Sequence, residues 1–252
     1  MADVSVVVNT FNEEARLPAC LNSVRWAKDI VVVDMHSEDR TAKIASEFGC
    51  RVFQFERMGY VEPARNFALS QAKNSWVLVL DADEQASAGL SSWMQKQLDT
   101  TNAAAFRIPR RNFYGDKWLT CCGWFPDEQL RLFRRDRVRY SDRIHRAPDI
   151  DGSVETLPLR GDAFIHHAAV ESLRSRFEKT TKYAAIAGEA MFKEGRRTNA
   201  ASLLGATTFE FFKAYFLQGG IRAGGLGAVL SLERAMAVYL KYSSLWEQQQ
   251  QS

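Results

Sequence analysis

Two carboxylates stand where a short apolar run of the sequence ends. Asp81 and Asp83 directly follow residues 76–80, which read WVLVL and have the length and apolar character of a buried strand. Two carboxylates at a strand end can supply the hard oxygen ligands that Mg²⁺ or Mn²⁺ prefers beside a diphosphate. The Asp-x-Asp pattern also arises by chance, as at Asp149 and Asp151, where no strand precedes it. Position therefore favours the first pair as a cation site, with an ordinary strand-ending turn as the alternative.

Two more apolar runs, 4–8 and 30–33, are also followed by residues that could contact a ligand. Ligands of open parallel sheets bind beyond the carboxyl ends of the strands. The side chains that follow these runs are therefore expected at the same edge as Asp81. They belong to Thr10, Phe11, Glu13 and Asp34.

A basic stretch lies between Arg107 and Arg146, with eleven Lys and Arg against five Asp and Glu. The whole chain has 33 basic and 30 acidic residues, a net charge of +3, which is too small to indicate a nucleic-acid partner. The local excess predicts an anionic ligand near this stretch. A solvated basic face is the alternative.

The apolar runs alternate with helical patterns over the first hundred residues. Strand–helix alternation with nearly uniform apolar strands predicts a Rossmann-like α/β sandwich with a mostly parallel sheet. The expected strands are 4–8, 30–33, 51–55 and 76–80, and the expected helices are 13–27, 41–48 and 62–72. Neither a G-x-G-x-x-G after the first strand nor a G-x-x-x-x-G-K-[ST] is present, which argues against dinucleotide oxidoreductases and P-loop nucleotidases.

The composition is that of a folded protein, with 252 residues, 46% hydrophobic and 25% charged. After Ala103 the pattern changes to strands and loops rich in arginine and aromatic residues, and from Val170 onward it is helical. We expect a catalytic domain over 1–168 and a C-terminal helical region over 169–252. Within the first, residues 1–100 are expected to be the nucleotide-binding half and 101–168 the half that contacts an acceptor.

Five segments, in this order, resemble glycosyltransferase family 2. They are VVVNTFNEEARLPACLNSV, VVVDMHSEDRTAKIA, ARNFALSQAKNSWVLVLDADE, WFPDEQLRLFRR and RIHRAP. The last two are similar to the branch of lipopolysaccharide-core β-1,4-glucosyltransferases. The resemblance covers essentially the whole chain and implies the GT-A fold and inversion of configuration at the transferred sugar.

The resemblance also implies a donor site. Thr10, Phe11 and Glu13 would surround the nucleoside, and Asp34 would contact the uracil or the ribose. An aromatic ring can stack on a base, and a carboxylate can accept hydrogen bonds from ribose hydroxyls. A hydrophobic staple for Phe11 and helix capping for Asp34 are the alternatives. Further donor contacts are expected from Arg65, which could equally be a surface charge, and from Asp81.

The catalytic base implied by the resemblance is Asp127, in the segment PDEQLRLF. An inverting transfer needs a carboxylate that removes the proton of the attacking hydroxyl. Glu128 is its neighbour, and adjacent residues of an extended segment point in opposite directions. The sequence does not show which of the two faces inward.

The metal site implied by the resemblance consists of Asp83 and His145, since a neutral imidazole can bind Mn²⁺. A structural histidine is the alternative. The chain departs from the family at Arg146, where an acidic residue is common, which puts the local acceptor contacts in doubt. His166 and His167 are adjacent, so packing or hydrogen bonding is expected for them.

The resemblance, together with these residues, implies a transferase that moves glucose from UDP-glucose, with a divalent cation, to a glycolipid such as the lipopolysaccharide inner core. One alternative is a sugar nucleotidyltransferase. An enzyme of that class would need a glycine-rich loop after the first strand, and residues 9–14 contain no glycine. Another is a non-catalytic protein that binds polyanions or membrane surfaces, with steep salt dependence. Nucleic acid is not expected as a partner.

The C-terminal region is rich in aromatic residues, with Phe209, Phe211, Phe212, Tyr215 and Phe216 in eight positions. Core packing and contact with an anionic membrane are both open. A membrane span is not expected because charged residues interrupt each apolar stretch. The four cysteines have no metal-binding or redox spacing, and the N-terminus has no signal-peptide pattern. We therefore expect a cytoplasmic protein. We also expect it to be peripheral on the inner face of the cytoplasmic membrane.

Overall fold

Two compact units make up the chain in the computed structural model, which describes residues 3–56, 62–140, 148–170 and 172–251. The first unit comprises Met1–Arg111 and Asp127–Ala168. The second comprises Asn112–Pro126 and Ala169–Ser252. The chain therefore passes into the second unit, returns to the first, and ends in the second.

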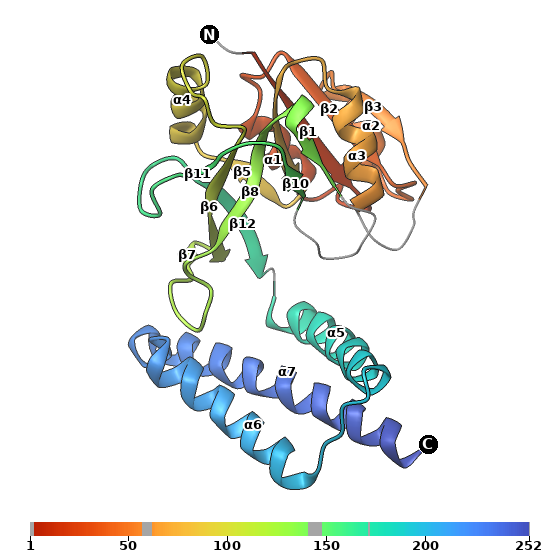
Figure 1. Ribbon diagram of the computed structural model, residues 1–252. Helices are drawn as coiled ribbons and strands as arrows, with labels where there is room; N and C mark the ends of the chain where they lie inside the picture. The colour runs from red at the N-terminus through yellow and green to blue at the C-terminus, as the bar shows by residue number, and fades with distance from the viewer. Residues whose placement is uncertain (1–2, 57–61, 141–147, 171, 252) are drawn as a thin grey trace. The chain divides into compact units, whose positions relative to one another are not determined.

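Four parallel strands begin the sheet of the first unit, in the spatial order β3-β2-β1-β4 (Figure 1). Their bounds are β1 Val4–Thr10, β2 Asp29–Asp34, β3 Arg51–Gln54 and β4 Trp76–Asp81. The helices between and after them are α1 Leu17–Ser23, α2 Thr41–Glu47, α3 Glu62–Gln71 and α4 Ala88–Gln97. The predicted strand–helix alternation is confirmed.

Antiparallel strands continue the sheet beyond β4, in the order β8-β6-β12-β5. They are β5 Glu84–Ala86, β6 Ala105–Tyr114, β8 Glu128–Arg134 and β12 Ile165–Val170. Strands β7 Lys117–Trp118 and β11 Val154–Thr156 pair with β6. Strands β9 Val138–Arg139 and β10 Asp149–Ile150 form a separate pair after the 3₁₀ turn η1 Arg135–Arg137.

The central strands are covered on both faces because successive strand residues point to opposite sides. In β1, Val6 and Val8 belong to the core that contains α1, α2 and α4, whereas Val7 belongs to the core that contains α3. Because each face of β1 packs against a different core, the side chains on both faces are apolar. The uniform VSVVV run of the sequence reflects this double burial.

Two of the differences from the expected element boundaries bear on the site. Helix α1 begins at Leu17 and not at Glu13, because Pro18 is accommodated only in a first helical turn and residues 13–16 form a turn before it. Strand β1 extends to Thr10, because its last residues pair with β2 and β4. Thr10 is therefore part of the strand end and not of the loop after it.

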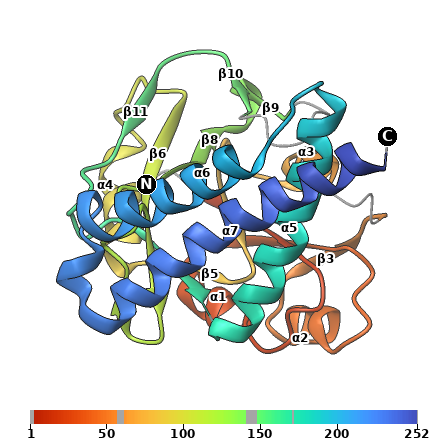
Figure 2. The ribbon, with the colours of Figure 1, turned by 90° about the horizontal axis from the view of Figure 1, so that it is seen from below.

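The second unit is built on three helices, with α7 between α5 and α6 (Figures 1 and 2). Their bounds are α5 Leu173–Lys193, α6 Ala200–Phe212 and α7 Gly224–Gln250. A π-helical turn η2, Lys213–Leu217, and a 3₁₀ turn η3, Gly220–Ala223, connect α6 to α7. The predicted C-terminal helical extension is confirmed. None of the helices in the described ranges is long and apolar enough to cross a membrane.

The glycine-rich break in the sequence serves the α6–α7 connection. Gly219 and Gly224 have φ of 76° and 61°, in the left-handed region where a side chain is strained. Gly227 packs so closely on Gly220 that a Cβ atom placed on Gly227 would lie 1.8 Å from the Gly220 carbonyl oxygen. The glycines therefore allow a tight helical connection, and the C-terminal helix can pack against the turn before it.

Candidate active site

The loops that follow β1 and β2 are joined by hydrogen bonds at the carboxyl edge of the sheet. The Asn12 amide N–H donates to Ser37 Oγ at 2.8 Å, and the Glu38 N–H donates to Asn12 Oδ1 at 2.8 Å. The Glu13 N–H donates to Thr41 Oγ1 at 2.8 Å. Hydrogen bonds between backbone groups and short polar side chains thus fix the two loops relative to each other.

Three residues predicted to surround the nucleoside lie on the first of these loops or at the strand end before it. Thr10 is buried, and its hydroxyl oxygen has no hydrogen-bond partner among the described residues. Phe11 is half-buried. Glu13 is also half-buried and forms an ion pair with Arg16, with 2.9 Å between Oε2 and Nη1.

Asp34 lies at the end of β2 and is buried. Its Oδ1 accepts a hydrogen bond from Ser37 Oγ at 2.5 Å, and its Oδ2 accepts one from the Ser37 N–H at 3.0 Å. The carboxylate therefore shapes the turn after β2. Since a carboxylate has about four acceptor positions, it retains capacity for a ligand.

Asp81, the last residue of β4, is held by two arginines. Arg65 Nη2 lies 3.2 Å from Oδ1, and Arg131 Nη2 lies 2.5 Å from Oδ2. Burial by itself would raise the pKa of Asp81, but the charges and hydrogen bonds of Arg131 and Arg65 hold it well below its ordinary value. Arg65 is therefore not an isolated surface charge, and Asp81 remains ionised.

Glu84 connects these arginines to the rest of the site, from a position with no solvent exposure. Its Oε1 accepts from Arg131 Nη2 at 2.9 Å and from Arg110 Nη1 at 3.0 Å. Its Oε2 accepts from the Asp81 amide N–H at 3.0 Å. Burial would lower the pKa of Arg131, but the charges of Asp81 and Glu84 raise it above its ordinary value. This buried carboxylate therefore pairs with two arginines and also fixes the backbone of the Asp-x-Asp segment.

Asp127 lies at the other end of the same chain of ion pairs. Its Oδ2 accepts from Arg110 Nε at 2.8 Å, and its Oδ1 accepts from Gln129 Nε2 at 2.6 Å. Its side chain is 19% exposed, whereas Glu128 is exposed. Adjacent residues of an extended segment point in opposite directions, so the two side chains differ in exposure. Asp127 is the one that joins the network of ion pairs.

Asp83 contacts a histidine that the sequence analysis did not place in the site. His167 Nε2 lies 3.4 Å from Asp83 Oδ2. The contact arises because β12 pairs antiparallel with β5, with His167 opposite Glu84 in register. Burial would raise the pKa of Asp83, but the hydrogen bond and charge of His167 lower it below its ordinary value. His145, the other predicted metal ligand, lies outside the described residues.

A carboxylate and an imidazole side by side form part of a donor set that suits Mn²⁺. Within the described ranges no group of three or more His, Cys, Asp or Glu side chains gathers to hold a metal. The remaining ligands of a cation at Asp83 and His167 would therefore be phosphate oxygens or water, as is usual for hard divalent ions that bind nucleotides.

Four residues that connect the site were not predicted from the sequence, namely Glu84, Arg110, Arg131 and His167. A weak signal for Arg131 exists, because residues 127, 129 and 131 alternate onto one side of a strand. The local basic excess of the sequence acts partly within the protein, since Arg110 and Arg131 neutralise Glu84, Asp81 and Asp127.

Comparison with known proteins gives a consistent result. Residues 5–145 match the model of a family described as Glycosyl transferase family 2. The chain is 25% identical over 256 residues to the lipopolysaccharide core biosynthesis glycosyltransferase LpsC of Rhizobium meliloti, covering 97% of this chain and 92% of LpsC. It is 28% identical over 260 residues to an uncharacterized glycosyltransferase of Rickettsia typhi, covering 98% and 88%.

The fold is similar to that of the solved structure of TarS residues 1–349 from S. aureus. The TM-score is 0.52 at 15% sequence identity, and the match covers 99% of this chain and 92% of that one. The expected GT-A fold, a mixed α/β structure with a mainly parallel sheet and a helical C-terminal part, is confirmed.

The network predicts a large stability cost for the neutral variant Glu84→Gln. Two arginines would then lose a buried counter-charge, so the free energy of unfolding should fall by about 3 kcal/mol or more. Urea denaturation followed by circular dichroism measures the change. Glu128→Gln, on the exposed neighbour of Asp127, should stay within about 0.5 kcal/mol of the parent. A Glu84→Gln protein as stable as the Glu128→Gln control would contradict the structural role of Glu84.

Proposed function

Because the chain belongs to glycosyltransferase family 2 and is a glycosyltransferase, we propose that it transfers glucose from UDP-glucose to a glycolipid acceptor. The proposed acceptor is the lipopolysaccharide inner core, and the product is a β-glycosidic bond formed with inversion. Membership in this family sets aside the sugar nucleotidyltransferase alternative.

The observation that carries this proposal is the chain of ion pairs from Asp81 through Arg131, Glu84 and Arg110 to Asp127. It ties the candidate donor carboxylate to the candidate base at one edge of the sheet. A transfer reaction requires both groups at fixed positions, because the nucleophile must attack the anomeric carbon opposite the leaving diphosphate. Rigid ion pairs between buried side chains supply this fixed geometry.

The donor nucleotide is proposed to bind over the loops after β1 and β2. Phe11 would stack on the base, while Thr10, Glu13 and Asp34 would supply polar contacts. TarS, which shares the fold, has been solved in complex with UDP. The unpartnered Thr10 hydroxyl at the strand end supports a ligand contact there. Arg65 and Asp81 would extend the donor site toward the diphosphate.

A divalent cation, Mn²⁺ or Mg²⁺, is proposed to bind Asp83 and His167. Asp83 suits this role better than Asp81, because both oxygens of Asp81 already bind arginines. When bound, the cation would neutralise charge on the leaving diphosphate. His145 stays a sequence-based candidate for a further ligand. Asp83 would be the carboxylate ligand of the cation whether or not His145 also binds it.

Asp127 is proposed to be the base. Arg110 and Gln129 fix the orientation of its carboxylate, and its side chain is 19% exposed. The hydroxyl proton would pass to Asp127 as the hydroxyl oxygen forms its bond to the anomeric carbon and the bond to the diphosphate breaks. The partly exposed carboxylate leaves room for an acceptor to approach.

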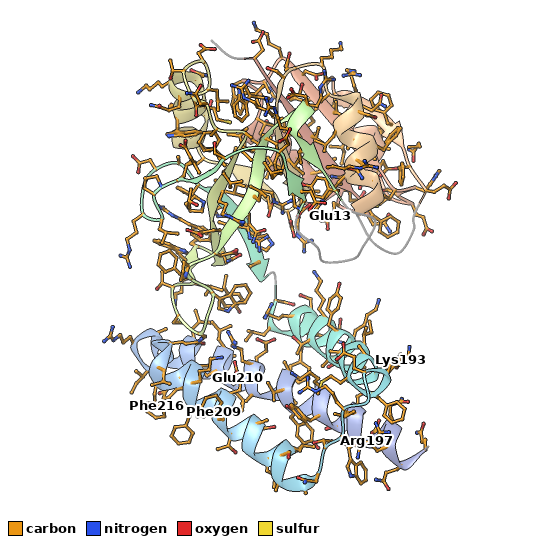
Figure 3. The ribbon with its side chains drawn as sticks, in the orientation of Figure 1. Glu13, Lys193, Arg197, Phe209, Glu210 and Phe216 are labelled. Atoms are coloured by element: carbon orange, nitrogen blue, oxygen red, sulfur yellow. The ribbon has the colours of Figure 1, made fainter. Side chains whose placement is uncertain are left out.

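The acceptor is proposed to be met at the inner leaflet of the cytoplasmic membrane, where the chain would bind as a peripheral protein. LpsC, by its name, acts in lipopolysaccharide core biosynthesis. Phe209, Phe212 and Phe216 recur at i, i+3 and i+7 along α6 and η2 and are 64%, 55% and 49% exposed. Phe209 and Phe216 point away from α7 (Figure 3). This surface, Phe209, Phe212 and Phe216, is called the aromatic face below.

Charge near the aromatic face suits an anionic lipid surface. Arg222, in η3, is exposed and has no carboxylate partner among the described residues. Lys213, in η2, lies 3.4 Å from Glu210 and is partly neutralised. Exposed aromatic rings beside an unpaired cation are typical of peripheral contact with anionic membranes.

The metal proposal predicts that Asp83→Ala and His167→Ala lose Mn²⁺-dependent binding of UDP, because each removes one of two protein ligands. Isothermal titration calorimetry with and without EDTA measures this. His166→Ala is the matched control, because adjacent strand residues point to opposite faces and its side chain should not share the site. Equal UDP affinity in the parent and the Asp83→Ala protein, with or without EDTA, would exclude the proposed metal site.

The base proposal predicts that Asp127→Asn lowers kcat by about 10²–10⁴-fold, the range of a general-base contribution, while UDP-glucose binding stays nearly unchanged. Glu128→Gln is the matched control and should lower kcat far less, because Glu128 is exposed and outside the network. Steady-state rates with a core glycolipid acceptor give the comparison. The reverse ranking of the two variants would assign the base to Glu128.

The membrane proposal predicts that the parent protein floats with vesicles that contain anionic lipid, and floats less at high salt. Replacing Phe209, Phe212 and Phe216 by serine should abolish flotation, because the buried apolar area is lost. Replacing Tyr239 and Trp246, which are both 46% exposed on α7, by serine is the control. These substitutions are preferable to truncation after Ala200, which would remove α7 from its packing on α5. Retained flotation of the triple variant would move the contact to another surface.

A further inference from the structure

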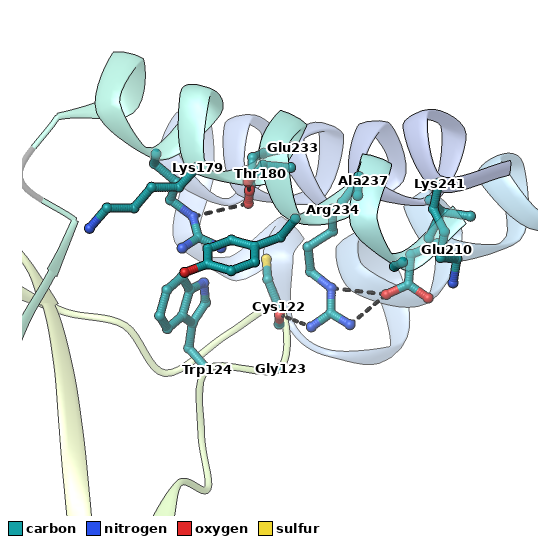
Figure 4. A pocket seen from close by; sticks show the side chains of 15 residues that line it. Cys122, Gly123, Trp124, Lys179, Thr180, Glu210, Glu233, Arg234, Ala237 and Lys241 are labelled. Carbon is teal, nitrogen blue, oxygen red and sulfur yellow. Dashed lines mark hydrogen bonds and ion pairs between the residues drawn. The ribbon is translucent and has the colours of Figure 1, made fainter. Parts of the chain in front are cut away.

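A cavity of about 590 Å³ lies within the second unit (Figure 4). It is lined by α5, α6, α7 and the loop Cys122–Trp124, and every lining residue belongs to that unit. Its volume is in the range of about 300–1,000 Å³ that is usual for small-molecule sites. None of the residues proposed for donor, metal or base takes part in it, so the cavity requires its own explanation.

The arginines and glutamates of the cavity neutralise one another. Arg234 donates to Glu210 Oε1 from Nε at 2.9 Å and from Nη2 at 2.5 Å, and to the Cys122 carbonyl from Nη1 at 2.6 Å. Arg176 Nε lies 3.2 Å from Glu233 Oε2. These pairs fix the walls of the cavity and leave neither arginine with an unbalanced charge.

Two lysines that line the cavity are not neutralised. Lys179, on α5, and Lys241, on α7, have no carboxylate within 4 Å among the described residues. Figure 4 shows Lys179 near the Trp124 end and Lys241 near the Glu210 end. An ammonium group offers three donors and no acceptor. The free charge of the cavity is therefore positive, and it suits a ligand that carries anionic oxygens.

Aromatic and small side chains form the rest of the wall. Trp124 has the Arg176 guanidinium 4.5 Å from its ring centroid, which holds the indole in place. Tyr183 also lines the cavity and is 64% exposed, so much of its surface is available to a ligand. Ala184, on α5, and Ala237, on α7, also line the cavity, and their small side chains leave space in it. Aromatic surfaces with a polar tip, next to hydrogen-bonding groups, suit the C–H faces and hydroxyls of a sugar ring.

We propose that this cavity binds an acidic saccharide, that is, a sugar that carries a phosphate or a carboxylate group. The anionic group pairs with Lys179 or Lys241, and the sugar ring lies against Trp124 and Tyr183. The loop that carries Trp124 continues along the chain into Asp127. That this saccharide is part of the acceptor is a further step, and that step alone rests on the proposed function.

The test is calorimetric titration of the full chain with four probes, in the absence of metal and of UDP. Glucose 6-phosphate and glucuronate should both bind, and neutral glucose and inorganic phosphate should each bind at least tenfold more weakly. If only one of the two acids binds, the anionic group is narrowed to phosphate or to carboxylate and the assignment stands. Equal binding of glucose, equal binding of inorganic phosphate, or no binding of either acid overturns it.

Variants locate the binding in the cavity. Lys179→Ala combined with Lys241→Ala should weaken binding of the acidic sugars about tenfold or more, because charge-assisted hydrogen bonds are lost. Ala237→Phe should also weaken it by filling part of the cavity that Ala237 lines. Lys182→Ala, an exposed lysine of α5 outside the cavity, is the control and should bind as the parent does. Unchanged affinity in the double lysine variant overturns the assignment, whatever the transferase assay shows, because no donor is present.

Discussion

A single buried carboxylate, Glu84, constrains the candidate active site of this glycosyltransferase. It has no solvent exposure and accepts hydrogen bonds from Arg110, Arg131 and the backbone of Asp81. A buried charge is tolerated only when its partners are complete, since removing water from an ion costs several kcal/mol. The two arginines, in turn, reach Asp81 and Asp127. The need to neutralise one buried group therefore sets the positions of two carboxylates that are far apart in the sequence.

Each acidic residue of the edge has a different environment, and its proposed role follows from that environment. Asp81 is paired with two arginines and is kept ionised, which suits a fixed structural and donor-binding group. Asp83 faces an imidazole and no arginine within 4 Å among the described residues, which suits a metal ligand. Asp127 accepts hydrogen bonds from Arg110 and Gln129, and part of its side chain stays exposed to solvent. Three aspartates of similar intrinsic acidity are thus differentiated by their neighbours.

Ion pairs between arginines and carboxylates also fix side chains in the second unit, where they surround a cavity. Arg234 and Arg176 are each paired with a glutamate, and these pairs stabilise the helices around a cavity. Each pair has no net charge, so the positive charge of the cavity comes from Lys179 and Lys241. Small residues at helix contacts make the close packing possible, as at Gly188, where a Cβ atom would lie 2.6 Å from the Lys241 carbonyl oxygen. The helical unit therefore combines close helix packing with a cavity whose unpaired side chains are positively charged.

The sequence by itself determined the parallel strands, because residues buried on both faces of a sheet form uniform apolar runs such as 4–8 and 76–80. It also indicated the family and the carboxylates at the strand ends, since position after a strand is a local property. It could not determine that His167 reaches Asp83, because this depends on the register between β5 and β12, strands separated by about eighty residues. Nor could it show that Asp127, and not Glu128, joins the ion-pair network, or that Arg110 and Arg131 pair with carboxylates of the protein itself. Those outcomes depend on which side chains share a buried space, and only the tertiary structure decides that, because the desolvation of a charge is a property of its whole surroundings.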